Sequence, residues 1–262
     1  MDLQLKNKVA LVAASSKGIG YTCAEALLRE GAKVTICARN KEVLEAAKAD
    51  LVTINQNVLS VVADVSSYAD IKNLVKKTNE HFGGLDILVT NAGGPKHGSF
   101  LELDDKEWKK TLELNLMSAV RLIRESLPYL KKSESGRIIN ISSIAAKQPM
   151  PEFVLSSSVR VGIHGLTSSL VVELGKYGIT INNVMPGYTL TDRMKNIYSE
   201  KAAEAGKSLD EIISEISGNI PIKRIGKPED VASLVTFLAS KQAGYITGTS
   251  ITIDGGVTKT VF

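Results

Sequence analysis

VALVAASSKGIG, residues 9–20, predicts a strand that runs directly into a glycine-bearing turn. The apolar run at 9–14 is typical of a buried strand, and the apolar pattern from Cys23 to Leu28 predicts a helix immediately after the turn. Gly18 and Gly20 let the backbone approach a ligand closely, and the helix N-terminus offers free N–H groups and the positive end of a dipole. Strand, turn and helix in this order predict a cradle for a pyrophosphate.

Short apolar runs alternate with longer helical patterns along the whole chain of 262 residues. Strands are expected at 8–14, 33–38, 58–64, 85–91, 136–142, 179–185 and 250–254. Helices are expected at 18–30, 41–52, 67–82, 104–131, 153–176, 208–217 and 228–240. Because most of these strands are almost continuously apolar, we expect a parallel sheet covered on both faces. The pattern predicts an α/β fold, a single Rossmann-type doubly wound sheet of about seven strands, with residues 1–262 forming one domain.

The segment 188–227 breaks the alternation, because it is long and polar and follows the end of a strand. Long irregular insertions beside the carboxyl edge of a sheet often cover a ligand. We interpret this segment as a lid over the substrate, with a disordered surface loop as the alternative.

Composition excludes several classes of protein. The formal charge of +4, from 32 basic and 28 acidic residues, is small and dispersed, which disfavours a nucleic-acid partner. No apolar run is long enough for a membrane span, and the N-terminus lacks the apolar core of a signal peptide, so we expect a cytoplasmic protein with no membrane partner. Cys23 and Cys37 are expected to be buried, reduced and inert, and the histidines show no metal-ligand spacing.

The end of the second strand indicates which dinucleotide is bound. In an NAD site an acidic side chain near this point holds the ribose 2′-hydroxyl, but the chain has Ala38 followed by Arg39. Lys17 in the glycine turn adds a second cation on the same side of the adenosine. Two cations without a carboxylate suit a 2′-phosphate, so we expect NADP(H) in preference to NAD(H). The alternative is that both are ordinary surface charges.

Several motifs in the right order resemble the short-chain dehydrogenase/reductase family, in particular its 3-oxoacyl-[acyl-carrier-protein] reductase branch. The family's Thr-Gly-x-x-x-Gly-x-Gly stands here at 13–20, with Ala13 for threonine and Ala14 for the first glycine. A methyl group at Ala14 is tolerable if φ of this residue is negative. The last-strand ending Asp254-Gly255-Gly256 also matches. The resemblance implies cofactor contacts from Ser15, Ser16, Lys17, Gly18, Ile19, Gly20, Arg39, Asp64, Val65, Asn91, Ala92, Gly93, Arg160, Pro186, Gly187, Thr189 and Thr191.

The catalytic residues implied by the resemblance are only partly present. Asn115 matches the helix-four asparagine, and Ser143, with Ser142 beside it, matches the serine that orients the carbonyl. The family's tyrosine stands thirteen residues later and its lysine four beyond, where this chain has Ser156 and Arg160. A phenol with a reference pKa of about 10 can be brought into working range by a cation, but a serine hydroxyl cannot. Arg160 can stabilise a developing alkoxide but cannot relay a proton.

Three interpretations of this gap stay open. In the first, the protein is an NADP(H)-dependent oxidoreductase for a 3-oxoacyl thioester or another small carbonyl or alcohol, and Tyr188 replaces the missing acid. Lys96, His97 and Lys147 are further candidate donors, and the alternative for Tyr188 is a wall of the substrate pocket. In the second, the chain binds NADP(H) as a sensor or partner subunit with little turnover. In the third, it is a scaffold without a ligand, against which the retained Gly18, Gly20, Asn91 and Asn115 argue.

The resemblance also implies a homo-oligomer, a dimer or a tetramer, in which helices 104–131 and 153–176 pair across two-fold axes.

Overall fold

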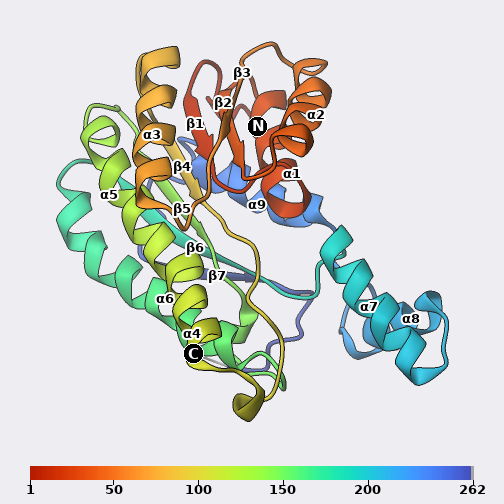
Figure 1. Cartoon of the computed structure of the whole chain (residues 1–262). Helices are drawn as coiled ribbons and strands as arrows, with labels where there is room; N and C mark the ends of the chain where they lie inside the picture. Colours follow the sequence, from red (N-terminus) through yellow and green to blue (C-terminus); the bar gives the residue numbers. More distant parts are fainter. Residues whose placement is uncertain (261–262) are drawn as a thin grey trace.

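A computed structural model of the chain, which describes residues 1–260, contains one parallel sheet of seven strands in the order β3-β2-β1-β4-β5-β6-β7. The strands are β1 (Val9–Val12), β2 (Lys33–Ala38), β3 (Val58–Val62), β4 (Ile87–Thr90), β5 (Arg137–Ile141), β6 (Thr180–Pro186) and β7 (Ser250–Ile253). The strand order confirms the predicted doubly wound sheet. The chain moves from β1 outward to β3 and then returns to begin β4 beside β1 (Figure 1), so the carboxyl ends of β1 and β4 border the crevice where such sheets bind ligands.

Helices cover both faces of this sheet (Figure 1). They are α1 (Gly18–Arg29), α2 (Lys41–Val52), α3 (Tyr68–Phe82), α4 (Asp105–Thr111), α5 (Ser118–Leu130), α6 (Val154–Gly175), α7 (Asp192–Ala205), α8 (Leu209–Asn219) and α9 (Pro228–Ala239). Alternate strand residues face opposite layers, since Val12 packs with α1, α2 and α9 whereas Leu11 packs with α3, α5 and α6. Cys23 and Cys37 are buried and unbridged in these two layers.

The predicted helix 104–131 is interrupted by a π-helical turn (η2, Leu112–Met117) between α4 and α5. Asn115 lies inside this turn and is 4% exposed. Its Nδ2 donates a hydrogen bond to the Gly93 carbonyl across the layer, at 2.9 Å. π-turns widen a helix locally and are common at functional sites. Regular apolar spacing could not reveal the interruption, because the turn depends on this contact with the end of β4.

The segment 188–227 is largely helical, so its interpretation as a long irregular insertion was wrong. The sequence predicted α8, but α7 was missed because its apolar face is narrow. Thr191 caps its N-terminus by accepting a hydrogen bond from the Met194 amide, and Gly206, with φ of 64°, ends it. Tyr198 and Ala202 occupy one face of α7 and pack with Ile212 of α8 in a small separate core.

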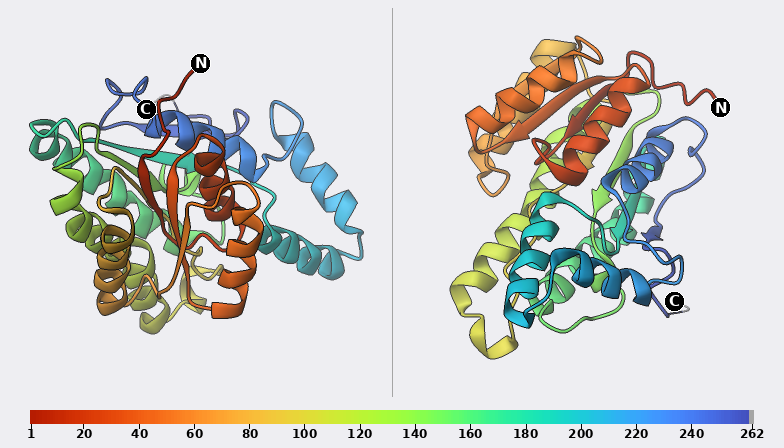
Figure 2. Two further views of the ribbon diagram at one scale, coloured as in Figure 1. Left: turned by 90° about the horizontal axis from the view of Figure 1, so that it is seen from above. Right: turned by 90° about the vertical axis from the view of Figure 1, so that its right-hand side faces the viewer.

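Helices α7 and α8 project to one side of the sheet, as Figure 1 and the left view of Figure 2 show. Parallel pairing of Thr189 with Gly226 ties the chain entering and leaving this lobe. Its role as a lid stays a prediction.

Within residues 1–260, none of the helices combines the length and the apolarity needed to cross a bilayer.

Candidate active site

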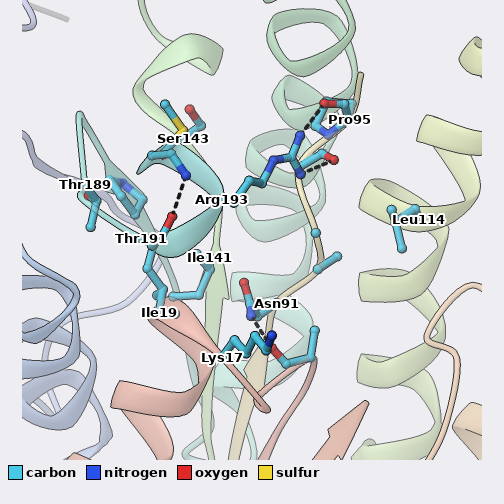
Figure 3. Close-up of a pocket in the computed structure, with 18 of the residues that line it drawn as sticks. Lys17, Ile19, Asn91, Pro95, Leu114, Ile141, Ser143, Thr189, Thr191 and Arg193 are labelled. Atoms are coloured by element: carbon cyan, nitrogen blue, oxygen red, sulfur yellow. Dashed lines mark hydrogen bonds between the residues drawn. The ribbon is translucent and has the colours of Figure 1, made fainter. Parts of the chain in front are cut away.

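A cavity of about 610 Å³ opens along the carboxyl ends of the strands. The glycine turn after β1 forms one side of it, and residues that follow β2, β3, β4, β5 and β6 complete it. Figure 3 shows Lys17 and Asn91 at one end and Ser143 and Arg193 at the other. Ligands of open α/β sheets bind in this position, so the fold places the predicted site where the topology requires it.

The glycine turn is packed too tightly for side chains at its key positions. Gly18 has φ of +56°, and a Cβ on Gly20 would lie 2.5 Å from the Ala14 carbonyl and 2.7 Å from Asn91 Nδ2. That Nδ2 donates to the carbonyls of Ala13 and Ala14 at 3.2 and 3.1 Å, and so ties the end of β4 to the turn (Figure 3). The side chain of Asn91 therefore acts on the cofactor site by holding the cradle in shape.

Ala14 adopts φ of +47°, so the negative φ that would accommodate its methyl group is not found. The left-handed region costs a residue with a Cβ roughly 1–2 kcal/mol. A glycine there avoids this strain but loses roughly 0.5–1 kcal/mol through the greater freedom of the unfolded chain.

We therefore expect Ala14→Gly to raise the free energy of unfolding by roughly 0.5–1 kcal/mol, as measured by urea denaturation. Ala26→Gly in the interior of α1 is the matched control, and should lower it by about 1 kcal/mol. An equal decrease in the free energy of unfolding in Ala14→Gly and Ala26→Gly would show that Ala14 is unstrained.

Lys17 and Arg39 both line the cavity, together with Asp64 and Val65. The Arg39 side chain is 74% exposed, and its Nη1 lies 3.8 Å from an Asp64 carboxylate oxygen. An ion pair this exposed and this long contributes little, so Arg39 is free to turn toward an anion in the cavity.

Ser15 lies beneath the turn instead of facing the cavity. Its Oγ donates to the Val12 carbonyl at 2.7 Å and accepts from the Cys37 amide at 3.1 Å, so it links β1 to β2. Ser15 was predicted to contact the cofactor; in the structure its role is to support the turn from below. Ser16, Ile19, Ala92 and Gly93 line the cavity, as do Pro186, Gly187, Thr189 and Thr191, and their contact with a cofactor stays a prediction.

Ser143, Ser156 and Arg160 line the part of the cavity that we call its candidate catalytic end. Ser143 follows β5 and accepts a hydrogen bond from the Ala145 amide at 3.1 Å, which fixes its Oγ and leaves its hydrogen free to donate. Arg160 is 7% exposed, and its Nη1 donates to the carbonyls of Ile141 at 3.2 Å and Ser142 at 2.8 Å. Burial, and after it the charge of Arg193, lowers the pKa of Arg160 to about 10.

Asn115 stands behind this end and acts through Gly93. Its Nδ2 is bonded to the Gly93 carbonyl, while its Oδ1 is buried without a partner among residues 1–260. Asn115 therefore positions the segment after β4 that lines the cavity.

Of the candidate proton donors, Tyr188 and His97 line the cavity. Tyr188 is half-buried and packs against the α7–α8 core, so it also forms part of the wall. The ring of His97 lies 4.3 Å from that of Phe153, and burial, followed by the charges of Arg193 and Lys201, lowers its pKa. Lys96 instead lines a smaller neighbouring cavity, and Lys147 is not among the residues that line either one.

Two groups at the site were missed by sequence reasoning. Ser142 lines the cavity, and its Oγ is hydrogen-bonded to His164 Nε2 at 2.9 Å. Burial, and after it the positive charge of Arg160, lowers the pKa of His164. The spacing of four residues between Arg160 and His164 places both on one face of α6, a signal that could have linked them. Arg193 is the second missed group, because nothing in the sequence predicted α7.

The lowered pKa of His164 predicts how stability depends on pH. Below pH 6.5, the ordinary pKa of histidine, His164 is protonated more readily in the unfolded chain than in the folded chain. The stability that neutral His164 contributes is therefore fully present above pH 6.5, and it is lost as the pH falls below this value. The urea concentration at the midpoint of unfolding should fall between about pH 7.5 and about pH 5.5, and replacing His164 with glutamine should make this fall smaller. Part of the loss should remain, because the pKa of His97 is lowered as well.

Arg160 on α6 is the charged group that shifts the pKa of His164, and Ser142 at the end of β5 is its hydrogen-bond partner. His81→Gln, at an exposed position of α3, is the matched control and should keep the full pH dependence. If the urea midpoint of the His164→Gln protein changed with pH as much as that of the parent, the assignment of this pH dependence to His164 would be contradicted.

Comparisons with known proteins show which family the chain resembles over almost its whole length. The family profile for enoyl-(acyl carrier protein) reductase matches residues 13–258. The chain is 34% identical over 253 residues to the 3-oxoacyl-[acyl-carrier-protein] reductase FabG of Haemophilus influenzae, covering 97% of this chain and 99% of that protein. It superposes with a TM-score of 0.96 on L-sorbose reductase from Gluconobacter frateurii in complex with NADPH and L-sorbose, at 32% identity and full coverage of both chains.

A third similar protein is an NADPH-bound short-chain oxidoreductase from Pseudomonas aeruginosa that contains an atypical catalytic center. It has a TM-score of 0.90 and 29% identity, and covers 98% of this chain and 100% of its own.

Proposed function

The chain belongs to the short-chain dehydrogenase/reductase family, oxidoreductases that act on CH–OH and C=O groups, and we propose that it transfers hydride between NADP(H) and a small carbonyl or alcohol substrate. The proposal includes a proton donor other than the family's tyrosine, because Ser156 stands in that position. The observation that carries it is a single cavity that runs from Lys17 and Arg39 to Ser143 and Arg160. A 3-oxoacyl thioester or another small ketone is the substrate class we infer.

The residues present fit a dinucleotide. Gly20 keeps the turn compact, because a Cβ there would collide with the Ala14 carbonyl and Asn91, and α1 begins at Gly18 with N–H groups available for phosphates. Lys17 and Arg39 would hold a 2′-phosphate, Asp64 and Val65 the adenine, and Thr189 and Thr191 the nicotinamide amide. When bound, the nicotinamide supplies or accepts the hydride. The cation pair favours NADP(H) over NAD(H), and the NADPH-bound structures of similar proteins support that choice.

The chain's own side chains would complete the reaction at the other end. Ser143 donates a hydrogen bond to the substrate oxygen and orients the carbonyl. Arg160 stabilises negative charge that develops on that oxygen, since its guanidinium is buried and stays charged at neutral pH. Tyr188 donates the proton, because it retains the phenol chemistry lost at Ser156 and lines the same cavity.

Oligomerisation is also proposed. Val161 and Val172 on α6 are 49% and 85% exposed, and Leu112 at the start of η2 is 40% exposed. Large apolar side chains in such positions favour burial against a second copy of the chain, as a dimer or a tetramer.

The proposed function is tested by titrating the protein with NADPH and NADH while following nucleotide fluorescence, and then measuring NADPH oxidation with ketones and 3-oxoacyl thioesters. We expect tighter binding of NADPH than of NADH, and turnover on at least one carbonyl. Binding without turnover on any substrate would instead support the sensor or partner-subunit function, which the absence of the family's tyrosine and lysine favours. No binding of either nucleotide would overturn both.

A further inference from the structure

We infer that the substrate of this cavity carries a carboxylate close to its reacting carbonyl or alcohol carbon. The inference rests on the proposed function, because it takes the Arg160 end of the cavity as the place where the substrate reacts. It is carried by two arginines that face the cavity without an acidic partner.

Arg160 is the first of these arginines. Its hydrogen bonds go to two backbone carbonyls, and its Nε is buried without a partner among residues 1–260. Carbonyl groups satisfy N–H donors but leave the positive charge uncompensated. A buried charge without a counter-charge is costly, and an anion in the cavity would relieve that cost.

Arg193 is the second. It belongs to the first turn of α7 and reaches across to the loop after β4, where its guanidinium donates to the carbonyls of Gly94 at 2.5 Å and Pro95 at 2.8 Å (Figure 3). Arg193 is exposed as a whole residue, although partial desolvation of its guanidinium lowers its pKa, and its charge contributes to the lowered pKa of both Arg160 and His97. The catalytic end of the cavity is therefore positively charged on both sides.

The described part of the chain supplies no carboxylate to these two groups. Other arginines are paired, such as Arg121 with Glu113 at 2.6 Å and Arg224 with Asp230 at 2.6 Å, but neither Arg160 nor Arg193 forms an ion pair with any of residues 1–260. The two acids that line the cavity, Asp64 and Asp192, form no ion pair with either arginine and lie 3.8 Å from Arg39 and Lys195, respectively.

The other groups at this end define the rest of the substrate. The walls of the cavity are mostly apolar, and they include Leu114, Ile144, Met150, Phe153, Tyr188 and Met194. Apolar walls exclude water and strengthen the attraction between a guanidinium and a carboxylate.

The substrate class is therefore an oxo acid with an apolar body, or the matching hydroxy acid. In the reductive direction a hydride from NADPH forms the new C–H bond, the C=O π pair moves to oxygen, and a proton converts that oxygen to a hydroxyl. The carboxylate is unchanged, and NADP⁺ and a hydroxy acid leave. Ser156, which is 5% exposed, lines the cavity one helical turn before Arg160.

The experiment compares acids with their uncharged analogues by calorimetry on the NADPH-saturated protein. The probes are α-ketoisocaproate and levulinate, each against its own amide, with inorganic phosphate as a third arm. At least one acid should bind about ten- to a hundred-fold more tightly than its amide, and the preference should weaken as salt is added. Tighter binding of phosphate than of either acid, or equal binding of acids and amides, would overturn the inference.

Variants assign the preference to the arginines. Arg160→Met and Arg193→Met should each reduce the ratio of acid to amide affinity, whereas Arg29→Met, an exposed arginine at the end of α1, should leave it unchanged. Arg193→Met keeps the test decisive if Arg160→Met fails to fold. An unchanged ratio in Arg193→Met and in a folded Arg160→Met would also refute the assignment.

Nucleotide fluorescence in the same samples separates this inference from the proposed function. NADPH binding without any acid preference would remove only the inference. An acid preference in a protein that binds no NADPH would overturn the proposed function and leave Arg160 and Arg193 as a carboxylate-binding site without a role in hydride transfer.

Discussion

Replacement of Tyr188 by phenylalanine is expected to slow hydride transfer to a carbonyl substrate by about 10²–10⁴-fold, the usual contribution of a general acid. The change removes a single hydroxyl from the cavity and keeps the ring that packs against the α7–α8 core, so folding and NADPH affinity should be preserved. Single-turnover oxidation of bound NADPH measures the effect directly, because it isolates the chemical step from product release.

Tyr198→Phe is the matched control for this prediction. Tyr198 belongs to the same lobe, is 3% exposed, and its hydroxyl is buried without a partner among residues 1–260. Because an unpaired buried hydroxyl is unfavourable, its removal should maintain or raise stability and leave the rate unchanged. Full activity of Tyr188→Phe would assign this residue to the pocket wall, and His97 would become the donor to test.

The second large effect is expected at Arg39. Substitution with aspartate removes a cation that would pair with the 2′-phosphate and adds a carboxylate that repels it. A hydrogen bond to a charged group contributes about 1.5–3 kcal/mol, so the affinity for NADPH should fall by at least roughly ten-fold, and by about a hundred-fold in low salt. The new carboxylate can also accept from a ribose 2′-hydroxyl, so the affinity for NADH should rise.

Fluorescence titration with both nucleotides at two salt concentrations measures this switch. Arg29→Asp is the control, because it makes the same change of charge at an exposed position away from the cavity. A ratio of NADPH to NADH affinity that did not move in Arg39→Asp would show that the arginine is a surface charge paired only with Asp64.

Much of the fold was predictable from local pattern. The seven strands agree with the predicted ranges to within two residues at either end, and the glycine turn, Asn91 and Ser143 lie where their motifs predicted. These features are readable because burial on both faces makes each strand continuously apolar, and a phosphate cradle requires glycine at fixed spacing after a strand. The π-turn around Asn115 and helix α7 were not predicted, because the first depends on a distant carbonyl and the second has few apolar residues.

The sequence alone therefore determined the layered parallel sheet, the dinucleotide cradle and the loss of the family's tyrosine and lysine. The tertiary structure decided what surrounds that gap: the contact between Ser142 and His164, the support of the turn by Ser15, and the approach of Arg193 to Gly94 from 99 residues away in the chain. Hydrophobic periodicity and turn chemistry act over a few residues, and so can be read along the chain. Charge balance in a cavity depends on which segments the fold brings together, and only the assembled structure shows that Arg160 and Arg193 line the same cavity without an ion pair to any of residues 1–260.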